Sequence, residues 1–135
     1  MVGADVFWFP ATRPVFEPLG CVDSRRSGRF LFVSAQAGLD ADLRPAAGLA
    51  AQAGTTMSQV RAAIEAVGGT TASVVSLTAY VNTTLFQDPI AEVAKAVGRA
   101  WKEQFGPSLT TATITGAQMF GIPGLIMEIH CIALI

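Results

Sequence analysis

Two polar side chains in the otherwise apolar stretch LIMEIHCIALI are the strongest candidates for chemistry in this sequence. Glu128 and His130 are two residues apart, so in a strand they project from the same face with their roots about 7 Å apart. Among apolar neighbours an unpaired carboxylate is costly, and burial raises the pKa of such a group. We predict Glu128 as a general acid or base with His130 as its partner; the alternative is a structural pair at a subunit interface.

A second group of polar residues follows the apolar run at 30–33. Four consecutive apolar residues predict a central strand buried on both faces, because half-exposed strands alternate apolar and polar residues. Ser34 and Gln36 come directly after this run, where a central strand stops and side chains often face a ligand. The end of this strand is therefore predicted to position a substrate.

The elements that hold these groups follow from apolar periodicity and turn residues. Strands are predicted at 4–9, 19–23, 30–33, 73–81, 109–115 and 125–135, with a turn at 24–28. Helices are predicted at 49–67 and 89–105, the second with Asp88 as N-cap and Pro89 at its first position. Their buried stripes are predicted to be Met57, Val60, Ile64 and Val67, and then Ile90, Val93, Val97 and Trp101.

The resulting order is β-β-β-α-β-α-β-β. Two helices are too few to cover both faces of one sheet, so the order predicts an α+β fold whose uncovered face is buried by another subunit. A length of 135 residues fits a single domain over 1–135, in which residues 1–18 form an N-terminal strand and a proline-rich covering arm.

Composition limits the classes of partner. A net charge of −1 provides no basic field for nucleic acid or for an anionic membrane surface, and no run approaches 18 apolar residues. Charged residues make up only 14% and hydrophobic residues 51%, which favours an oligomer. The start resembles no secretory signal, and two cysteines fit a reducing compartment, so a cytoplasmic location is predicted. One histidine and two cysteines are too few for a zinc site.

Three stretches together resemble the RidA family, also called YjgF: GRFLFVSAQAGLD, AAQAGTTMSQVRAAIEAVGGTTASVVSLTAYV and LIMEIHCIALI. The similarity spans about residues 19 to 135. It implies a chorismate-mutase-like fold with two helices on one face, a homotrimer, and active sites between subunits that need no cofactor. It also implies deamination of small imines or enamines, in which Glu128 orients a water molecule and Ser34 is retained from the S-G-x motif.

The chain departs from the deaminases of that family where they hold the substrate carboxylate. The resemblance implies a P-x-R-[ST] motif whose arginine holds that carboxylate. Residues 107–113 read PSLTTAT, without an arginine. The counterpart of the arginine is therefore Thr110, Thr111 or Thr113. A threonine hydroxyl gives one neutral hydrogen bond where a guanidinium gives a charged bidentate pair. Preference for a 2-imino acid is therefore not expected.

Other positions also differ from the family pattern. Counted back from Ser34 without a gap, the family's active-site tyrosine falls on Cys21, and its helix asparagine falls near Gly98. We interpret Cys21 either as a nucleophile, if a neighbour lowers its pKa, or as a buried structural thiol. Arg25 beside the predicted turn and Phe120 in the connection 116–124 are candidates for ligand contact.

Two hypotheses follow. The first is a homotrimeric RidA-like enzyme that acts on an imine, an enamine or a related conjugated carbonyl of a small metabolite, by hydrolytic deamination or tautomerisation. The second is a non-catalytic RidA-like protein that binds a small ligand or stabilises a partner enzyme; the loss of arginine, tyrosine and asparagine favours it. Ribonuclease activity, a historical label of the family, has no support in the charge of the chain.

Overall fold

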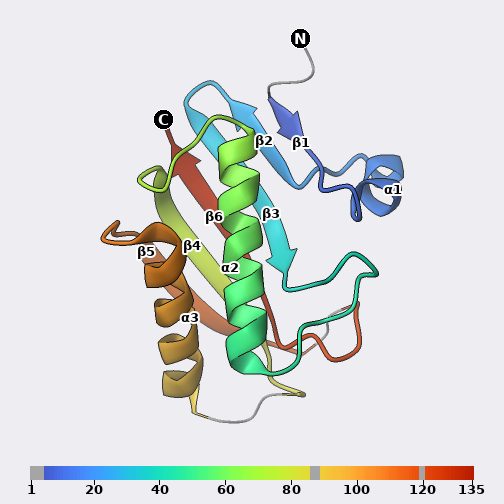
Figure 1. The fold of residues 1–135 in the computed structure, drawn as a ribbon, viewed down its shortest axis with the longest axis vertical. Coiled ribbons are helices and arrows are strands. Elements are labelled where there is room, and N and C mark those ends of the chain that lie inside the picture. The colour runs from blue at the N-terminus through green and yellow to red at the C-terminus, as the bar shows by residue number, and fades with distance from the viewer. Residues whose placement is uncertain (1–4, 86–88, 119–120) are drawn as a thin grey trace.

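The computed structural model describes residues 5–85, 89–118 and 121–135. Within these ranges the strands form a six-stranded sheet in the order β1-β2-β3-β6-β4-β5, and the two long helices cover one of its faces (Figure 1). The strands are β1 (Val6–Phe7), β2 (Ser24–Ser27), β3 (Phe30–Ala37), β4 (Val74–Asn82), β5 (Thr111–Ala117) and β6 (Met127–Leu134). The helices are α1 (Arg13–Phe16), a 3-10 turn η1 (Glu17–Leu19), α2 (Leu49–Ala66) and α3 (Ile90–Phe105). The predicted α+β class is confirmed.

Strand pairing places the last strand of the chain in the middle of the sheet. β6 pairs antiparallel with β3 on one side and with β4 on the other, while β4 and β5 are parallel. The crossover through α2 carries the chain past β6, from β3 to β4, whereas α3 connects the neighbouring parallel strands β4 and β5. The residues of β6, including Glu128, are thereby held by hydrogen bonds on both sides.

The core lies between the helices and the sheet. The predicted stripe of α2 is confirmed, since Met57, Val60, Ile64 and Val67 are no more than 1% exposed. In α3, Val93 and Val97 are buried, but Ile90 is 57% exposed, because it is the first residue of the helix and precedes the turns that reach the core. Asp88 lies outside the described residues, and Pro89 takes the N-cap position instead of the first helical position.

β3 is a central strand, as predicted, but its burial alternates. Leu31 and Val33 are buried toward the helices, whereas Phe30 and Phe32 are 52% and 46% exposed on the opposite face. The prediction of burial on both faces is wrong for the single chain, because α2 and α3 lie on one face only (Figure 1).

The N-terminal third differs from the prediction. Residues 19–23 are not a strand: η1 ends at Leu19, the capping residue Gly20 has a φ of 74°, and β2 begins only at Ser24. The predicted turn at 24–28 is instead mostly β2, with the turn starting at Gly28. The buried Ser24 hydroxyl donates to the Ala63 carbonyl of α2 at 2.7 Å and fixes β2 against that helix. The proline-rich segment, predicted as a covering arm, contains the short helical turns α1 and η1.

None of the helices in the described ranges has the length and apolar character needed to cross a membrane.

Candidate functional site

A pocket of about 330 Å³ lies at the end of β3, beside the segment that connects β1 to β2. We call this connecting segment, residues 8–20, the N-terminal arm. The arm, the end of β3, the loop that follows it, α2 and β6 all contribute to the walls. The polar lining residues are Thr12, Asp23, Gln36, Asp40, Gln59 and Glu128. Two residues predicted for the site, Gln36 and Glu128, therefore share one pocket.

A β-bulge shapes the end of β3. Val33 pairs with Cys131 and Gln36 pairs with Ile129, so Ser34 and Ala35 together oppose His130. The extra residue turns Gln36 toward the helix side, where it is 3% exposed, while Ser34 stays exposed. The Ser34 hydroxyl donates to the Val22 carbonyl at 2.7 Å. Ser34 thus ties β3 to the chain before β2, and its proton is already engaged.

Glu128 and His130 lie on the sheet face away from the helices, as alternation predicts. Glu128 is opposite Ala37 on one side and Tyr80 on the other, and His130 is opposite Thr78. Burial raises the pKa of the Glu128 carboxyl, and no charge or hydrogen bond from the described residues offsets this shift. A carboxyl that keeps its proton to higher pH than an ordinary glutamate is suited to donate it to a substrate.

Tyr80 is a member of this group that the sequence reasoning missed. Its hydroxyl lies 3.2 Å from Nε2 of His130, and the two rings stack with centroids 5.5 Å apart. Tyr80 also faces Glu128 in the strand register. Polar and apolar side chains alternate in residues 76–80, SLTAY, which places Tyr80 on the same face as Thr78. This alternation could have identified Tyr80 from the sequence.

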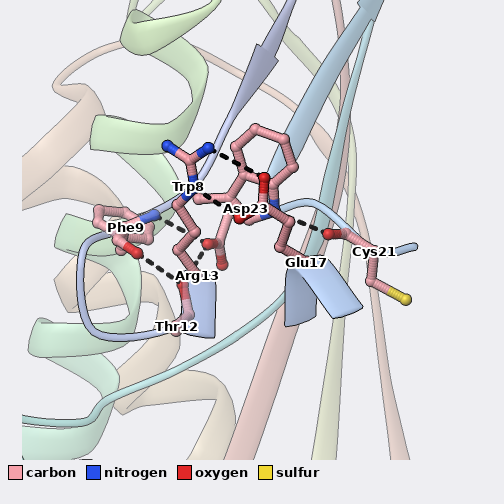
Figure 2. Close-up of polar contacts among 7 residues, drawn as sticks. All are labelled: Trp8, Phe9, Thr12, Arg13, Glu17, Cys21 and Asp23. Atoms are coloured by element: carbon pink, nitrogen blue, oxygen red, sulfur yellow. Dashed lines mark hydrogen bonds and ion pairs between the residues drawn. The ribbon is translucent and has the colours of Figure 1, made fainter. Parts of the chain in front are cut away.

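Asp23 was also missed, although it is the acid that organises one wall of the pocket. The side chain is 3% exposed and accepts hydrogen bonds from the Phe9 backbone N–H at 2.9 Å and from the Thr12 hydroxyl (Figure 2). Its other oxygen accepts from the Gln36 amide at 3.1 Å. Asp23 therefore joins the N-terminal arm to β3. In the sequence it looks like an ordinary polar residue, since aspartate is rarely buried.

Cys21 is exposed, so the interpretation as a buried thiol is wrong. Its thiol contacts only the Leu19 carbonyl, at 3.7 Å, and Figure 2 shows the sulfur pointing away from the other residues drawn. The backbone carbonyl of Cys21 accepts a hydrogen bond from the Trp8 indole at 2.7 Å. No base is hydrogen-bonded to this thiol among the residues that the structure describes, so the geometry offers no activation of Cys21 as a nucleophile.

The threonines of the penultimate strand lie away from the pocket of their own chain. The Thr110 and Thr111 hydroxyls donate to the backbone carbonyls of Thr111 and Val75, at 3.0 and 2.8 Å. Thr113 pairs with Thr78 and thus belongs to the row that contains His130. β6 and β4 separate these threonines from β3.

The two remaining predicted contacts are placed as follows. Arg25 is exposed on β2, opposite Phe32, and does not line the pocket. Phe120 lies outside the described residues.

Comparison with protein families adds the decisive observation. The family model described as endoribonuclease L-PSP matches residues 21–135. The chain belongs to this family, which is the YjgF/RidA family. The predicted resemblance is therefore confirmed. The match begins at Cys21, so the whole N-terminal arm lies before it.

Solved structures of the YjgF/RidA family share this fold. The Mycobacterium tuberculosis protein Rv2704 has a TM-score of 0.77 and 21% identity, with 96% of this chain and 98% of that chain covered. E. coli TdcF with bound serine has a TM-score of 0.73 and 17% identity, covering 85% and 87%. The E. coli YjgF gene product has a TM-score of 0.72 and 21% identity, covering 84% and 87%. The chorismate-mutase-like fold is confirmed; no similar sequence was found among curated proteins.

Proposed function

We propose that this YjgF/RidA protein is an enzyme that acts on an imine, an enamine or a related conjugated carbonyl of a small metabolite. The observation that carries the proposal is Glu128, a half-buried carboxyl with a raised pKa that lines a pocket of ligand size. Such a group is a candidate for proton transfer because its environment disfavours the charged form. The Tyr80–His130 pair beside it supplies further groups that can donate and accept protons.

Hydrolytic deamination needs no co-reactant other than water. The protonated carboxyl of Glu128 donates to the imine nitrogen, and the resulting carboxylate accepts a proton from the water that attacks the imine carbon. Glu128 then protonates the carbinolamine nitrogen, the carbon–nitrogen bond breaks, and the carboxylate takes the hydroxyl proton, which leaves a carbonyl and ammonia or an amine and returns Glu128 to its protonated state. Tautomerisation uses the same carboxyl to move a proton between carbon and nitrogen or oxygen. No cofactor takes part in either route.

We also propose that a neighbouring subunit completes the site. Phe30, Phe32 and Leu134 are 52, 46 and 37% exposed on the face that the helices leave open. Such an apolar face supports burial in a homotrimer. The neighbour's β5 would then bring counterparts of Thr110, Thr111 and Thr113 toward the pocket. Two free thiols, Cys21 and Cys131, fit the proposed cytoplasmic location.

Glu128→Gln tests the proposed chemistry. Glutamine keeps the shape of the side chain but cannot transfer the proton, so kcat on a panel of imines and enamines should fall by about 10²- to 10⁴-fold. Glu103→Gln, the same change at an exposed position of α3, is the matched control and should keep full activity. An unchanged rate in Glu128→Gln would eliminate this mechanism.

The alternative is a ligand-binding or partner-stabilising protein without catalysis. It is supported by the Ser34, Thr110 and Thr111 hydroxyls, whose protons are engaged by backbone carbonyls. Ligand binding by the wild type without turnover of any imine or enamine would favour it. Ribonuclease activity is not proposed, because the net charge of −1 offers no field for RNA.

A further inference from the structure

We infer that the pocket accepts neutral or cationic, largely apolar compounds with an N–H donor, and that the N-terminal arm selects among them. This inference rests on the proposed function, because it concerns the same site and names its substrate class: amine-derived imines or enamines that carry no carboxylate. The argument uses the charge of the lining, its unengaged polar atoms and the attachment of the arm.

The charge of the lining disfavours anions. Among the described residues that line the pocket, the ionisable side chains are Asp23, Asp40 and Glu128, and no lysine, arginine or histidine accompanies them. A carboxylate or phosphate group would enter beside these acids without a cation from this chain to balance it, and residues 107–113, which we propose that the neighbour contributes, contain no basic side chain. A protonated amine or a neutral N–H group meets no such penalty.

Most polar groups of the lining are already engaged within the protein. Asp40 accepts from the backbone N–H groups of Asp42 and Arg44, each at 2.9 Å. The Gln59 amide donates to the Leu39 carbonyl at 3.0 Å. These side chains hold the loop after β3 in place and have less capacity to select a ligand.

Besides Oδ2 of Asp40 and Oε1 of Gln59, acceptors remain on Gln36 and Glu128 at the end of the sheet. The Gln36 amide nitrogen donates to Asp23 and to the Ser34 carbonyl, each at 3.1 Å, which uses both of its hydrogens. Its carbonyl oxygen and the Glu128 carboxyl accept no hydrogen bond from the described part of the chain. The Gln36 oxygen can only accept, and the Glu128 carboxyl keeps an acceptor oxygen whether or not it holds its proton, so an N–H group of the ligand can pair with either.

The arm supplies the apolar wall. Phe9, Pro10, Ala11 and Phe16 line the pocket from the arm, and Ala35 and Ala37 line it from β3. Small alanines on one side and aromatic rings on the other leave room for one ring or one branched aliphatic group. A volume of about 330 Å³ is at the lower end of the range for small-molecule sites.

Asp23 is the positioning residue for both parts of this wall. One oxygen holds the arm through Phe9 and Thr12, and the other holds the Gln36 amide, so a single buried carboxylate sets the distance between arm and strand. The family match begins only at Cys21. The arm can therefore change ligand size selection while Glu128 stays in place.

Three probes of equal ring size test the charge preference on the full chain: benzylamine, benzyl alcohol and benzoate, titrated by calorimetry or NMR at neutral pH. Benzylamine should bind at least about tenfold more tightly than benzoate, the equivalent of roughly 1.4 kcal/mol. Benzoate binding as tightly as benzylamine would overturn the inference. Glu128→Gln should reduce the preference for benzylamine over benzyl alcohol.

Variants of the arm test size selection by comparison of benzylamine with methylamine. Phe9→Ala should reduce the affinity ratio of the two amines by several-fold, whereas Val15→Ala, on the same arm but 47% exposed and outside the lining, should not. Asp23→Asn should lower the same ratio, and if that variant does not fold, Thr12→Val removes one of its contacts. The role of the arm is contradicted if the affinity ratio is unaltered in Phe9→Ala and also in Asp23→Asn, or in Thr12→Val where Asp23→Asn does not fold.

These outcomes separate the inference from the proposed function. Loss of turnover in Glu128→Gln without any preference for amines would sustain the function and overturn the inference. A clear preference for amines without turnover would sustain the inference and overturn the proposed function.

Discussion

The Tyr80 hydroxyl lies 3.2 Å from Nε2 of His130, on the same open sheet face as Glu128. The three side chains come from two adjacent strands, so the sheet itself sets their spacing. Three titratable groups in one patch can move a proton between ligand, water and solvent more readily than an isolated carboxyl.

We predict that Tyr80→Phe lowers kcat/KM by about 10-fold or more if the pair takes part in proton transfer. Phenylalanine keeps the ring stacking with His130, so the stability cost should be only about 1 kcal/mol, the net value of one hydrogen bond. Kinetics on the best imine or enamine substrate and urea unfolding measure the two effects. Normal kinetics with reduced stability would identify the pair as structural.

The pKa of Glu128 predicts how stability depends on pH. Burial raises the pKa in the folded state above that in the unfolded chain, so the folded protein binds the proton more tightly. The charged carboxylate therefore destabilises the fold above the folded-state pKa, and this cost disappears as pH falls below the unfolded-state pKa. Glu128→Gln should unfold at a higher temperature than the wild type at neutral pH, with a difference that shrinks in acid. A difference that grows in acid would show that the carboxylate is stabilised instead.

Gly38, directly after β3, has no room for a side chain. A Cβ there would lie 2.7 Å from the Gln52 carbonyl oxygen and 3.0 Å from Oγ1 of Thr56. Gly38→Ala should destabilise the protein by about 1–3 kcal/mol, because backbone must shift to relieve the overlap. Gly54→Ala, within α2 and in open space, should instead stabilise by about 0.5–1 kcal/mol. Urea denaturation measures the free energy of unfolding of both variants. An equal change in the two variants would contradict the close approach of Gln52 and Thr56 to Gly38.

Gln52 joins α2 to the chain that enters β6. Its amide donates to the Gly124 carbonyl at 2.9 Å and accepts from the Ile126 N–H at 2.8 Å, and the side chain is 1% exposed. Gln52→Leu leaves both backbone groups without partners, which should cost about 2–5 kcal/mol. Gln104→Leu, at a half-buried position of α3, is the control and should change unfolding far less. A small effect at Gln52 would mean that water replaces the amide.

The open sheet face predicts the effect of a charge on self-association. Phe32→Asp places a carboxylate in the centre of the apolar face, so light scattering should show that the proposed trimer dissociates into folded monomers. Ile90→Asp, on α3 at the helix-covered side and 57% exposed, should leave the assembly unchanged. If the wild-type protein is a monomer in solution, the proposed inter-subunit site is wrong.

The sequence predicted the parts of the fold that local patterns determine. The stripe of α2 repeats every three or four residues, so Met57 and Ile64 could be assigned to the core from spacing alone. Alternation likewise placed Glu128 and His130 on one face. β2 was missed because Ser-Arg-Arg-Ser has no apolar pattern, and only pairing with β1 and β3 makes it a strand.

The candidate site was predictable only in part. Glu128 and Gln36 could be chosen because polar residues beside apolar runs stand out. The burial of Asp23 depends on the arm folding back over β3, a contact between distant segments that no local pattern reveals. The bulge at Ser34 also depends on pairing with β6, and it directs the serine hydroxyl to a backbone carbonyl.

The central position of β6 affects how the chain is made. Because this strand is synthesised after β3 and β4 yet lies between them, the ribosome releases both neighbours before their shared partner exists. Their inner edges then carry unpaired backbone groups, which invite association with other nascent chains. The strand that closes this gap also brings Glu128, so a chain long enough to have the carboxyl at its site is also one whose sheet is complete.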